Sequence, residues 1–350
     1  MGIGCDLVYD GGDMIVAPVD MGKPREDQLQ GTVAEQLSEL AGRVCYDSLG
    51  SGRNSKEYHK HILEVGHGSV YEHFHFTVEM NCADRELEMV KECLNRPDVL
   101  ATTSGGGHLR VTANIRSVLE WHGMCPNLAC PKVGPVMWSA AESLAPVIFG
   151  MMHNPYFCQS KFRIVPPRTE DEQWVSMLLK GSRGMSHEQV RHGDRTGISQ
   201  RSTRFCDETE SEWVRHPLYS AYLEETGDLE LHTKVTEATT MCRNVYSLMT
   251  GRLQKWIASK GTDKLTARKQ ARGAARGFLG NALYTELIFS ASVRQWKHMI
   301  RQRCSPGADA EIRQLYEHVL AVLQGSRYGN SFAGFELVAS PDGIGKIIKA

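Results

Sequence analysis

The stretch FHFTVEM, residues 74–80, limits the possible fold more than any other part of this chain. Its apolar and polar residues alternate strictly, with Phe74, Phe76, Val78 and Met80 on one side and His75, Thr77 and Glu79 on the other. A period of two is typical of a β-strand that buries one face. The pattern therefore predicts a half-buried strand and, with it, a sheet.

Helical periodicity dominates the remainder of the chain. Four segments place their apolar residues on one helical face or carry helix start and stop residues: 31–45, Ser55–Gly66, 84–95 and 310–324. Residues 284–303, YTELIFSASVRQWKHMIRQR, are also predicted to form a helix. Arg294 and His298 share a face of it because they are four residues apart. Helices beside a strand predict a chain that mixes both kinds of element.

The chain divides into four parts on composition and pattern. Residues 1–81 and 186–337 are predicted to form one main domain. Residues 82–185 are predicted to be an inserted subdomain, because prolines and a Gly-rich loop interrupt them. The tail, 338–350, is predicted to be poorly tied down.

Two short stretches share a small-residue–x–Arg core. They are LRVTANIRSVLEWH at 109–122 and LIFSASVRQWKH at 287–298. Either a duplication or chance explains the similarity, and the sequence leaves both open.

Composition excludes several classes of protein. The 350 residues carry a net charge of −1, whereas a general DNA-coating protein would be basic. No run of 18 apolar residues predicts a membrane span. The first residues lack the basic and apolar regions of a signal peptide, so we predict a cytoplasmic protein.

Ten scattered cysteines fit reduced thiols in a chain of this kind. One cluster, His122, Cys125 and Cys130, has some character of a metal site. It lacks a fourth ligand and the usual cysteine spacing, so we predict no metal.

Cationic and polar residues gather in three places. The first, GHGSVYEH, holds His67, Ser69, Glu72 and His73. The second, SHEQVRHGDRTGISQRSTRF, holds Glu188, Arg191, His192, Arg195, Ser199, Gln200, Ser202 and Arg204. The third holds Arg276, Arg294, His298 and Arg303.

Such clusters suit phosphorylated ligands. The guanidinium fork donates two parallel hydrogen bonds to a phosphate, and serine hydroxyls add short-range donors. The alternative is that these arginines form solvated surface and ion pairs between helices. No Walker A pattern, dinucleotide fingerprint, G-x-S-x-G elbow or HExxH helix is present, so a nucleotide site would belong to another class.

Taken in order, these motifs resemble the flavin-dependent thymidylate synthases (ThyX). AGRVCYDS with HILEVGHGSVYEH is similar to the N-terminal region of that family. HEQVRH with SQRSTRF resembles its RHR-x7-S signature, and ARKQARGAARGFLGNA and RQWKHMIRQRCSPGADAEIR resemble its later motifs. The similarity covers about residues 30–81 and 186–337.

The resemblance implies methylation of dUMP at C5, with methylenetetrahydrofolate as the carbon donor. It implies an α+β fold with a central antiparallel or mixed sheet and long helices. FAD reduced by NADPH supplies the hydride, and homotetramers share active sites. It implies that flavin contacts His67, Ser69, Glu72, Arg191, His192, Arg294 and His298. It implies that the nucleotide contacts Glu188, Gln200, Ser202, Arg204, Arg276 and Arg303, and that Ser202, Arg276 and Arg303 are catalytic.

The chain departs from the family pattern in three places. Gly193 stands where the signature has its third arginine, and we predict that Arg195 replaces it. Ser292 replaces an asparagine of the closing motif, and Cys45 replaces a serine seen in some members. The stretch TANIR, with Asn114 and Arg116, resembles the closing motif more closely, so residues 82–185 could supply flavin contacts.

These departures leave other functions open. Methylation of dCMP or hydroxymethylation of dUMP would keep the phosphate arginines and change the base pocket. A non-catalytic nucleic-acid-binding protein is less favoured, because acidic residues surround the arginines. The leading prediction has no nucleic-acid or membrane partner.

Overall fold

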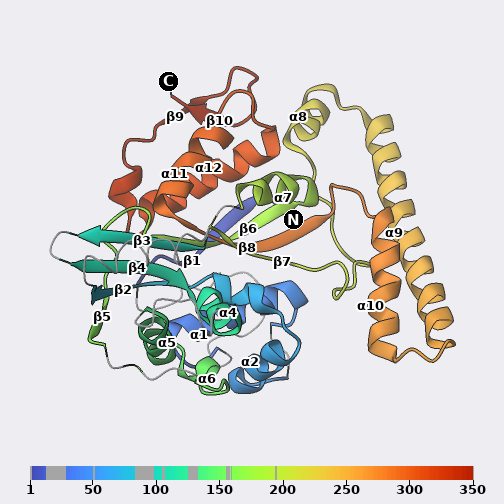
Figure 1. Cartoon of the computed structure of the whole chain (residues 1–350). Coiled ribbons are helices and arrows are strands. Elements are labelled where there is room, and N and C mark those ends of the chain that lie inside the picture. The colour runs from blue at the N-terminus through green and yellow to red at the C-terminus, as the bar shows by residue number, and fades with distance from the viewer. Residues whose placement is uncertain are drawn as a thin grey trace.

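The structure is a computed structural model. It describes residues 2–12, 29–49, 52–82, 98–104, 107–124, 133–154, 158, 160–193 and 195–349. Two four-stranded antiparallel sheets and several long helices make up the described part (Figure 1). The predicted α+β fold with an antiparallel sheet is therefore confirmed. No helix in these ranges is long and apolar enough to cross a membrane.

The first sheet has the strand order β1-β6-β8-β7, with bounds Gly4–Tyr9, Trp174–Ser182, Tyr284–Ser292 and Gly197–Gln200. Its two long central strands pair from Trp174↔Ser292 to Ser182↔Tyr284. Both are buried on both faces, as expected for strands covered on two sides. Helices α11 (Val293–Arg303) and α12 (Ala310–Gly325) pack on one face through Trp296 and Tyr316. Helix α1 (Val33–Tyr46) packs on the other face.

The prediction of one continuous helix over 284–303 is wrong. Residues 284–292 form strand β8, and the helix α11 begins only at Val293. Ser292 caps this helix, since its side chain accepts from the backbone of Gln295. Strand β8 is central and buried on both faces, and its consecutive apolar residues Leu287, Ile288 and Phe289 hide the alternation that marks a half-buried strand.

The second sheet has the order β3-β4-β2-β5, with bounds Val99–Ser104, His108–Asn114, His75–Asn81 and Phe162–Val165. The predicted strand at 74–80 is present as β2, but the prediction that only one face is buried is wrong. Glu79 is 8% exposed, because Arg110 and Arg163 pair with its carboxylate at 3.1 and 2.8 Å. The ion pairs of Glu79 thus allow the polar face of β2 to be buried as well.

Three helices follow β4 and accompany the second sheet: α4 (Ile115–Met124), α5 (Val133–Leu144) and α6 (Pro146–Phe149). Helix α2 (Ser55–Glu64) contacts α6. Asn54, rather than Ser55, caps α2. The stretches 109–122 and 287–298 are alike locally, since each contains the end of a strand and the start of a helix.

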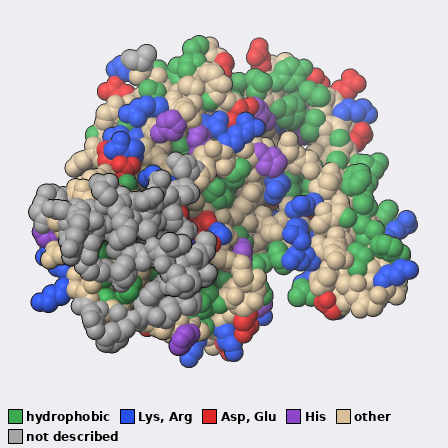
Figure 2. Space-filling model, in the orientation of Figure 1, with side chains coloured by type: hydrophobic (Ala, Val, Ile, Leu, Met, Phe, Trp, Pro, Cys, Tyr) green, Lys and Arg blue, Asp and Glu red, His purple; other side chains and the backbone are tan. Residues whose placement is uncertain are grey.

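Helices α8 (Pro217–Thr226), α9 (Leu229–Ala258) and α10 (Lys264–Ala275) form a separate feature. Helices α9 and α10 pack against each other and extend along one side of the molecule (Figure 1). Their outer surface carries many hydrophobic side chains (Figure 2).

The predicted loose tail is wrong. Strands β9 (Leu337–Ala339) and β10 (Lys346–Ile348) form a hairpin. The amide of Ile348 donates to the carbonyl of Cys304 at 2.8 Å, and Asp342 pairs with Arg313. The predicted helices at 31–45 and 310–324 are confirmed.

Two predicted features cannot be placed. The helix predicted near 84–95 and the thiols of Cys125 and Cys130, with the side chain of His122, lie outside the described residues. Within the ranges given above, no three His, Cys, Asp or Glu side chains form a group that could hold a metal ion.

Candidate active site

The signature segment forms one helix, one short turn and one strand. Helix α7 (Arg183–Gln189) leads into the 3-10 turn η2 (Val190–His192), and β7 follows. Ser182 caps α7, and its backbone amide and hydroxyl donate to the carboxylate of Glu311 at 2.7 and 2.6 Å. These buried bonds fix α7 against α12, so the side chains that follow are held by the core.

Arg303, at the end of α11, joins the closing motif to the signature. Its Nη1 donates to Oε2 of Glu188 at 2.6 Å, and its Nε donates to Nε2 of His192 at 2.9 Å. The ring of His298 lies edge-on to His192 at 6.3 Å between centroids. Four predicted site residues from two distant segments therefore meet here.

His192 accepts a hydrogen bond from Arg303 and must carry a neutral imidazole to do so. Burial, the charge of Arg303 and that of His298 lower its pKa to about 4. At neutral pH the cationic charge of this group therefore resides on Arg303, with Glu188 as its counter-ion.

The second half of the signature lies against α1 and α10. The amide of Ser202 donates to the carbonyl of Cys45 at 2.9 Å. Gln200 donates to the hydroxyls of Ser186 and Thr285 at 2.8 and 3.2 Å. A Cβ built on Gly273 of α10 would lie 3.9 Å from Nε of Arg204, so this guanidinium faces the helix that precedes Arg276.

Arg183 lies near the predicted site residue Arg276 and was not predicted from the sequence. Burial lowers the pKa of its guanidinium; the carboxylate of Glu208 opposes this, and the charge of Arg276 adds to it. Among the described residues, no hydrogen bond or ion pair engages the side chain of Arg183 or Arg276. Two neighbouring cations without a paired acid are suited to an anion. The signal in the sequence was an arginine directly after a strand and at the start of a helix.

Other arginines nearby have a structural role. Arg201 pairs with Glu208 at 2.6 Å, and Arg272 pairs with Asp207 at 2.6 Å. For these two, the alternative of ion pairs between segments is the better description.

The first cluster surrounds the 3-10 turn η1 (Gly68–Glu72). His67 shares a hydrogen bond with the hydroxyl of Tyr46 at 3.0 Å, and burial lowers the pKa of His67. Glu72 forms an ion pair with Arg116 of α4. His73 is fully buried and bonded to two serines, so it faces the core rather than a ligand.

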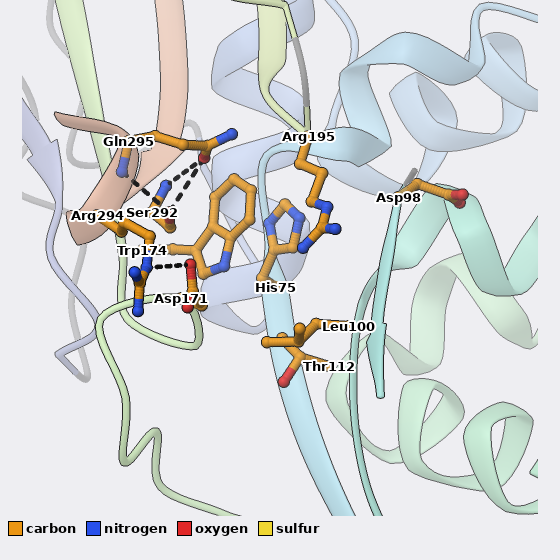
Figure 3. Close-up of a pocket in the computed structure, with 10 residues that line it drawn as sticks. All are labelled: His75, Asp98, Leu100, Thr112, Asp171, Trp174, Arg195, Ser292, Arg294 and Gln295. Carbon is orange, nitrogen blue, oxygen red and sulfur yellow. Dashed lines mark hydrogen bonds and ion pairs between the residues drawn. The ribbon is translucent and has the colours of Figure 1, made fainter. Parts of the chain in front are cut away.

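A cavity of about 240 Å³ brings Arg195 together with the β8–α11 corner (Figure 3). Arg195, Arg294 and Ser292 line it together with the rings of His75 and Trp174. These two rings are stacked, with centroids 3.3 Å apart. Arg294 also pairs with Asp171 at 2.8 Å.

This lining has unused donors. The buried Nε1 of Trp174 and Nδ1 of His75 have no hydrogen-bond partner within the described ranges, and no described side chain pairs with Arg195. Trp174 can only donate, and so can arginine. The residues present therefore fit a group rich in acceptor atoms, as a flavin nucleotide is.

The remaining predicted residues are more open. Arg191, Arg204, Arg276, Arg294 and His298 are exposed in the single chain. The structure thus joins the predicted residues into three neighbourhoods, around Arg303, around Ser202 and around Arg195. Among the described residues, no side-chain hydrogen bond or ion pair joins the third neighbourhood to the other two.

Comparison with known proteins agrees with these motifs. The family described as thymidylate synthase complementing protein matches residues 29–88 and 173–325, which is more than half of the chain. This chain belongs to that family.

Individual relatives carry a more specific name. The chain is 38% identical over 170 residues to the flavin-dependent thymidylate synthase of Mycolicibacterium gilvum, and 36% identical to that of Mycolicibacterium vanbaalenii. Identity to that of Mycobacterium tuberculosis H37Rv is 35%. In each case the alignment covers 48% of this chain and 64% of the relative.

Proposed function

We propose that this protein is a flavin-dependent thymidylate synthase. It methylates dUMP at C5 to give dTMP, with methylenetetrahydrofolate as the carbon donor and NADPH as the reductant. The observation that carries the proposal is the contact of Arg303 with Glu188 and His192, which joins two motifs 115 residues apart. The names of the relatives support the same activity.

Different side chains would bind the phosphate and the base of the nucleotide. Arg183, Arg204 and Arg276 would bind the nucleotide phosphate, because a dianion favours several guanidinium forks. Arg303, fixed by Glu188, would face the base, and Gln200 and Ser202 would orient it. Holding the reactants in place is the main contribution of such residues to rate.

FAD, reduced by NADPH, would supply the hydride. The FAD itself would be held by His67, Ser69, Glu72, Arg191, His192, Arg195, Arg294 and His298. Cations near the ring stabilise the negative charge that a reduced flavin carries. Arg195 and Arg294, which line one cavity, are the best placed for this role.

The finer predictions from the sequence belong to this proposal. The enzyme would be a cytoplasmic homotetramer whose subunits share active sites, with no nucleic-acid partner. The exposure of Arg191, Arg204 and Arg276 in the single chain supports shared sites, since a second subunit could cover them. The division at 81, 185 and 337 stays a prediction.

The test is to incubate the protein with FAD, NADPH, methylenetetrahydrofolate and either dUMP or dCMP, and to measure product masses. Addition of one methyl group to dUMP is the expected result. A methylated dCMP, or a hydroxymethylated dUMP, would assign the neighbouring activity instead. A colourless protein that binds no FAD would reject the proposal altogether.

A further inference from the structure

A second cavity lies beside the one that Arg195 and Arg294 share. It has a volume of about 340 Å³ and is formed by α4, the turn η1 and the signature loop. Arg195 and Asp98 line both cavities, so the two are neighbours. We call the second one the α4 cavity. Part of its wall comes from residues 89–172, which lie between the two stretches that the family matches.

Arg116 of α4 is at the centre of this wall. Its Nη1 pairs with Glu72, and its Nε pairs with Glu120 at 2.5 Å. Its Nε would lie 3.6 Å from a Cβ built on Gly68, and its charge contributes to the lowered pKa of His67. Arg116 therefore contacts or influences three positions of the first cluster.

The local fold holds Arg116 in place. Strand β4 pairs with β2 up to Asn114↔His75, and the amide of Ile115 donates to the carbonyl of Phe74. Asn114 then accepts from the amide and hydroxyl of Ser117, both at 2.8 Å, and so caps α4. These bonds fix the first turn of α4 beside η1.

The lining of the α4 cavity is polar throughout. Three carboxylates, Glu72, Asp98 and Glu120, face two guanidiniums, Arg116 and Arg195. An excess of carboxylates disfavours a phosphate. The described residues of this lining also include no apolar or aromatic side chain on which a ring system could pack. A hydroxyl group both donates and accepts, so it can bond to a carboxylate and a guanidinium at once.

We propose that the α4 cavity binds the hydroxyl groups of a nucleotide sugar, with Arg116 as donor and Glu72 as acceptor. Nη2 of Arg116 has no partner among the described side chains and is available for this bond. The inference rests on the proposed function, in which the sugar is the ribose or the ribityl chain of FAD. It assigns a cofactor contact to a segment outside the family match.

The test compares Arg116→Ala with Arg163→Ala in the full chain. Arg163 is a matched control, since it is an exposed arginine of the same segment and pairs with Glu79 at 2.8 Å. Dissociation constants are measured by fluorescence or calorimetry for FAD, FMN, ADP and pyrophosphate. Thermal unfolding of both variants shows whether either loses structure.

Arg116→Ala is expected to lower the affinity for FAD about tenfold, which is the effect of losing one hydrogen bond from a charged donor. Arg163→Ala is expected to change it less than twofold. A parallel loss for ADP assigns the ribose, and a parallel loss for FMN assigns the ribityl chain.

Two results would overturn the inference. One is equal FAD affinity in Arg116→Ala and Arg163→Ala. The other is a loss for pyrophosphate as large as that for FAD, which would make the α4 cavity an anion site. If the wild type binds ADP but no flavin, the proposed function fails and the inference is judged on ADP alone.

Discussion

Arg303 shows how a single guanidinium can set the protonation state of a neighbour. It donates to His192, and burial and its charge together lower the pKa of that imidazole. Burial is the larger cause, so removal of the charge can restore the pKa only in part.

Arg303→Gln is therefore expected to raise the pKa of His192 from about 4 toward, but not to, its ordinary value near 6.5. Histidine-selective NMR titration of the protein without ligands measures this directly. Arg301→Gln is the control, because Arg301 is exposed on the same helix and lies over Phe335. An unchanged pKa of His192 in Arg303→Gln would contradict the hydrogen bond between Arg303 and His192.

A substitution at Arg195 can change FAD affinity without lowering the free energy of unfolding. Its backbone is left-handed, with φ of 49°, which disfavours a side chain by about 1 kcal/mol. Arg195→Gly should therefore keep or slightly raise the free energy of unfolding, while FAD affinity falls about tenfold through the lost cation.

Urea unfolding and FAD titration of the same samples check both parts. Asp47→Gly, at the other described non-glycine position with positive φ, is the control for the backbone effect. Unchanged FAD affinity in Arg195→Gly would show that Arg195 does not replace the arginine missing at Gly193.

The residues of the site were easier to predict than the contacts that they make with other segments. Arg303, His192 and Glu188 stand in motifs, and the structure brings them together. The ion pair of Glu72 with Arg116 depends on the pairing of β2 with β4, which no local pattern specifies. Such contacts require the register of a sheet, and the sequence alone does not determine it.

At the scale of elements, a buried hydrogen-bond network connects three strands of the first sheet. Nδ1 of His73 bonds to Ser290 of β8 at 2.7 Å, and Nε2 bonds to Ser199 of β7 at 2.9 Å. Ser290 also bonds to Ser176 of β6 at 2.6 Å. His73 thus helps to hold β7, which leads into Gln200 and Ser202.

Burial lowers the pKa of His73 to about 3, far below the ordinary value. Between these values the unfolded chain binds a proton that the folded chain does not. Stability therefore falls as pH decreases from about 6.5, by about 2 kcal/mol between pH 7 and pH 5 for this residue.

His73→Gln keeps one amide bond to a serine and cannot titrate. Its loss of unfolding free energy between pH 7 and pH 5 should be about 2 kcal/mol smaller than that of the wild type. Urea unfolding at both pH values measures the difference, and His318→Gln, at an exposed histidine of α12, is the control. Equal losses in His73→Gln and the wild type would contradict a neutral buried His73.

Sequence patterns predicted helices α1 and α12 correctly because each has one apolar and one polar face. They failed at β8, where the central place in the sheet buries both faces. Periodicity reports how many faces an element buries, and a fully covered strand of nine residues resembles part of a buried helix.

At the scale of the whole molecule, helices α8, α9 and α10 carry most of the exposed large hydrophobic side chains of the described residues. Met241, Leu248, Trp256 and Leu265 are between 54% and 63% exposed. Figure 2 shows hydrophobic side chains along the helices that Figure 1 labels α8, α9 and α10. Apolar surface of this extent marks an interface between proteins.

The proposed homotetramer would cover this surface with other copies of the chain. Wild-type protein is then expected to have four times the 39.1 kDa mass of one chain in light scattering after gel filtration. The double variant Leu248→Glu, Trp256→Glu should dissociate into smaller species, because burial of a carboxylate without a partner is strongly unfavourable. Ile164→Glu, at an exposed apolar residue of β5, is the control and should keep the mass of the wild type.

Since shared sites need neighbouring subunits, the double variant should also lose most of its dUMP affinity, although both substitutions lie outside the three neighbourhoods of the site. A monomeric wild type with full dUMP affinity would show that one chain suffices for the nucleotide site and that the exposed arginines act without a second subunit.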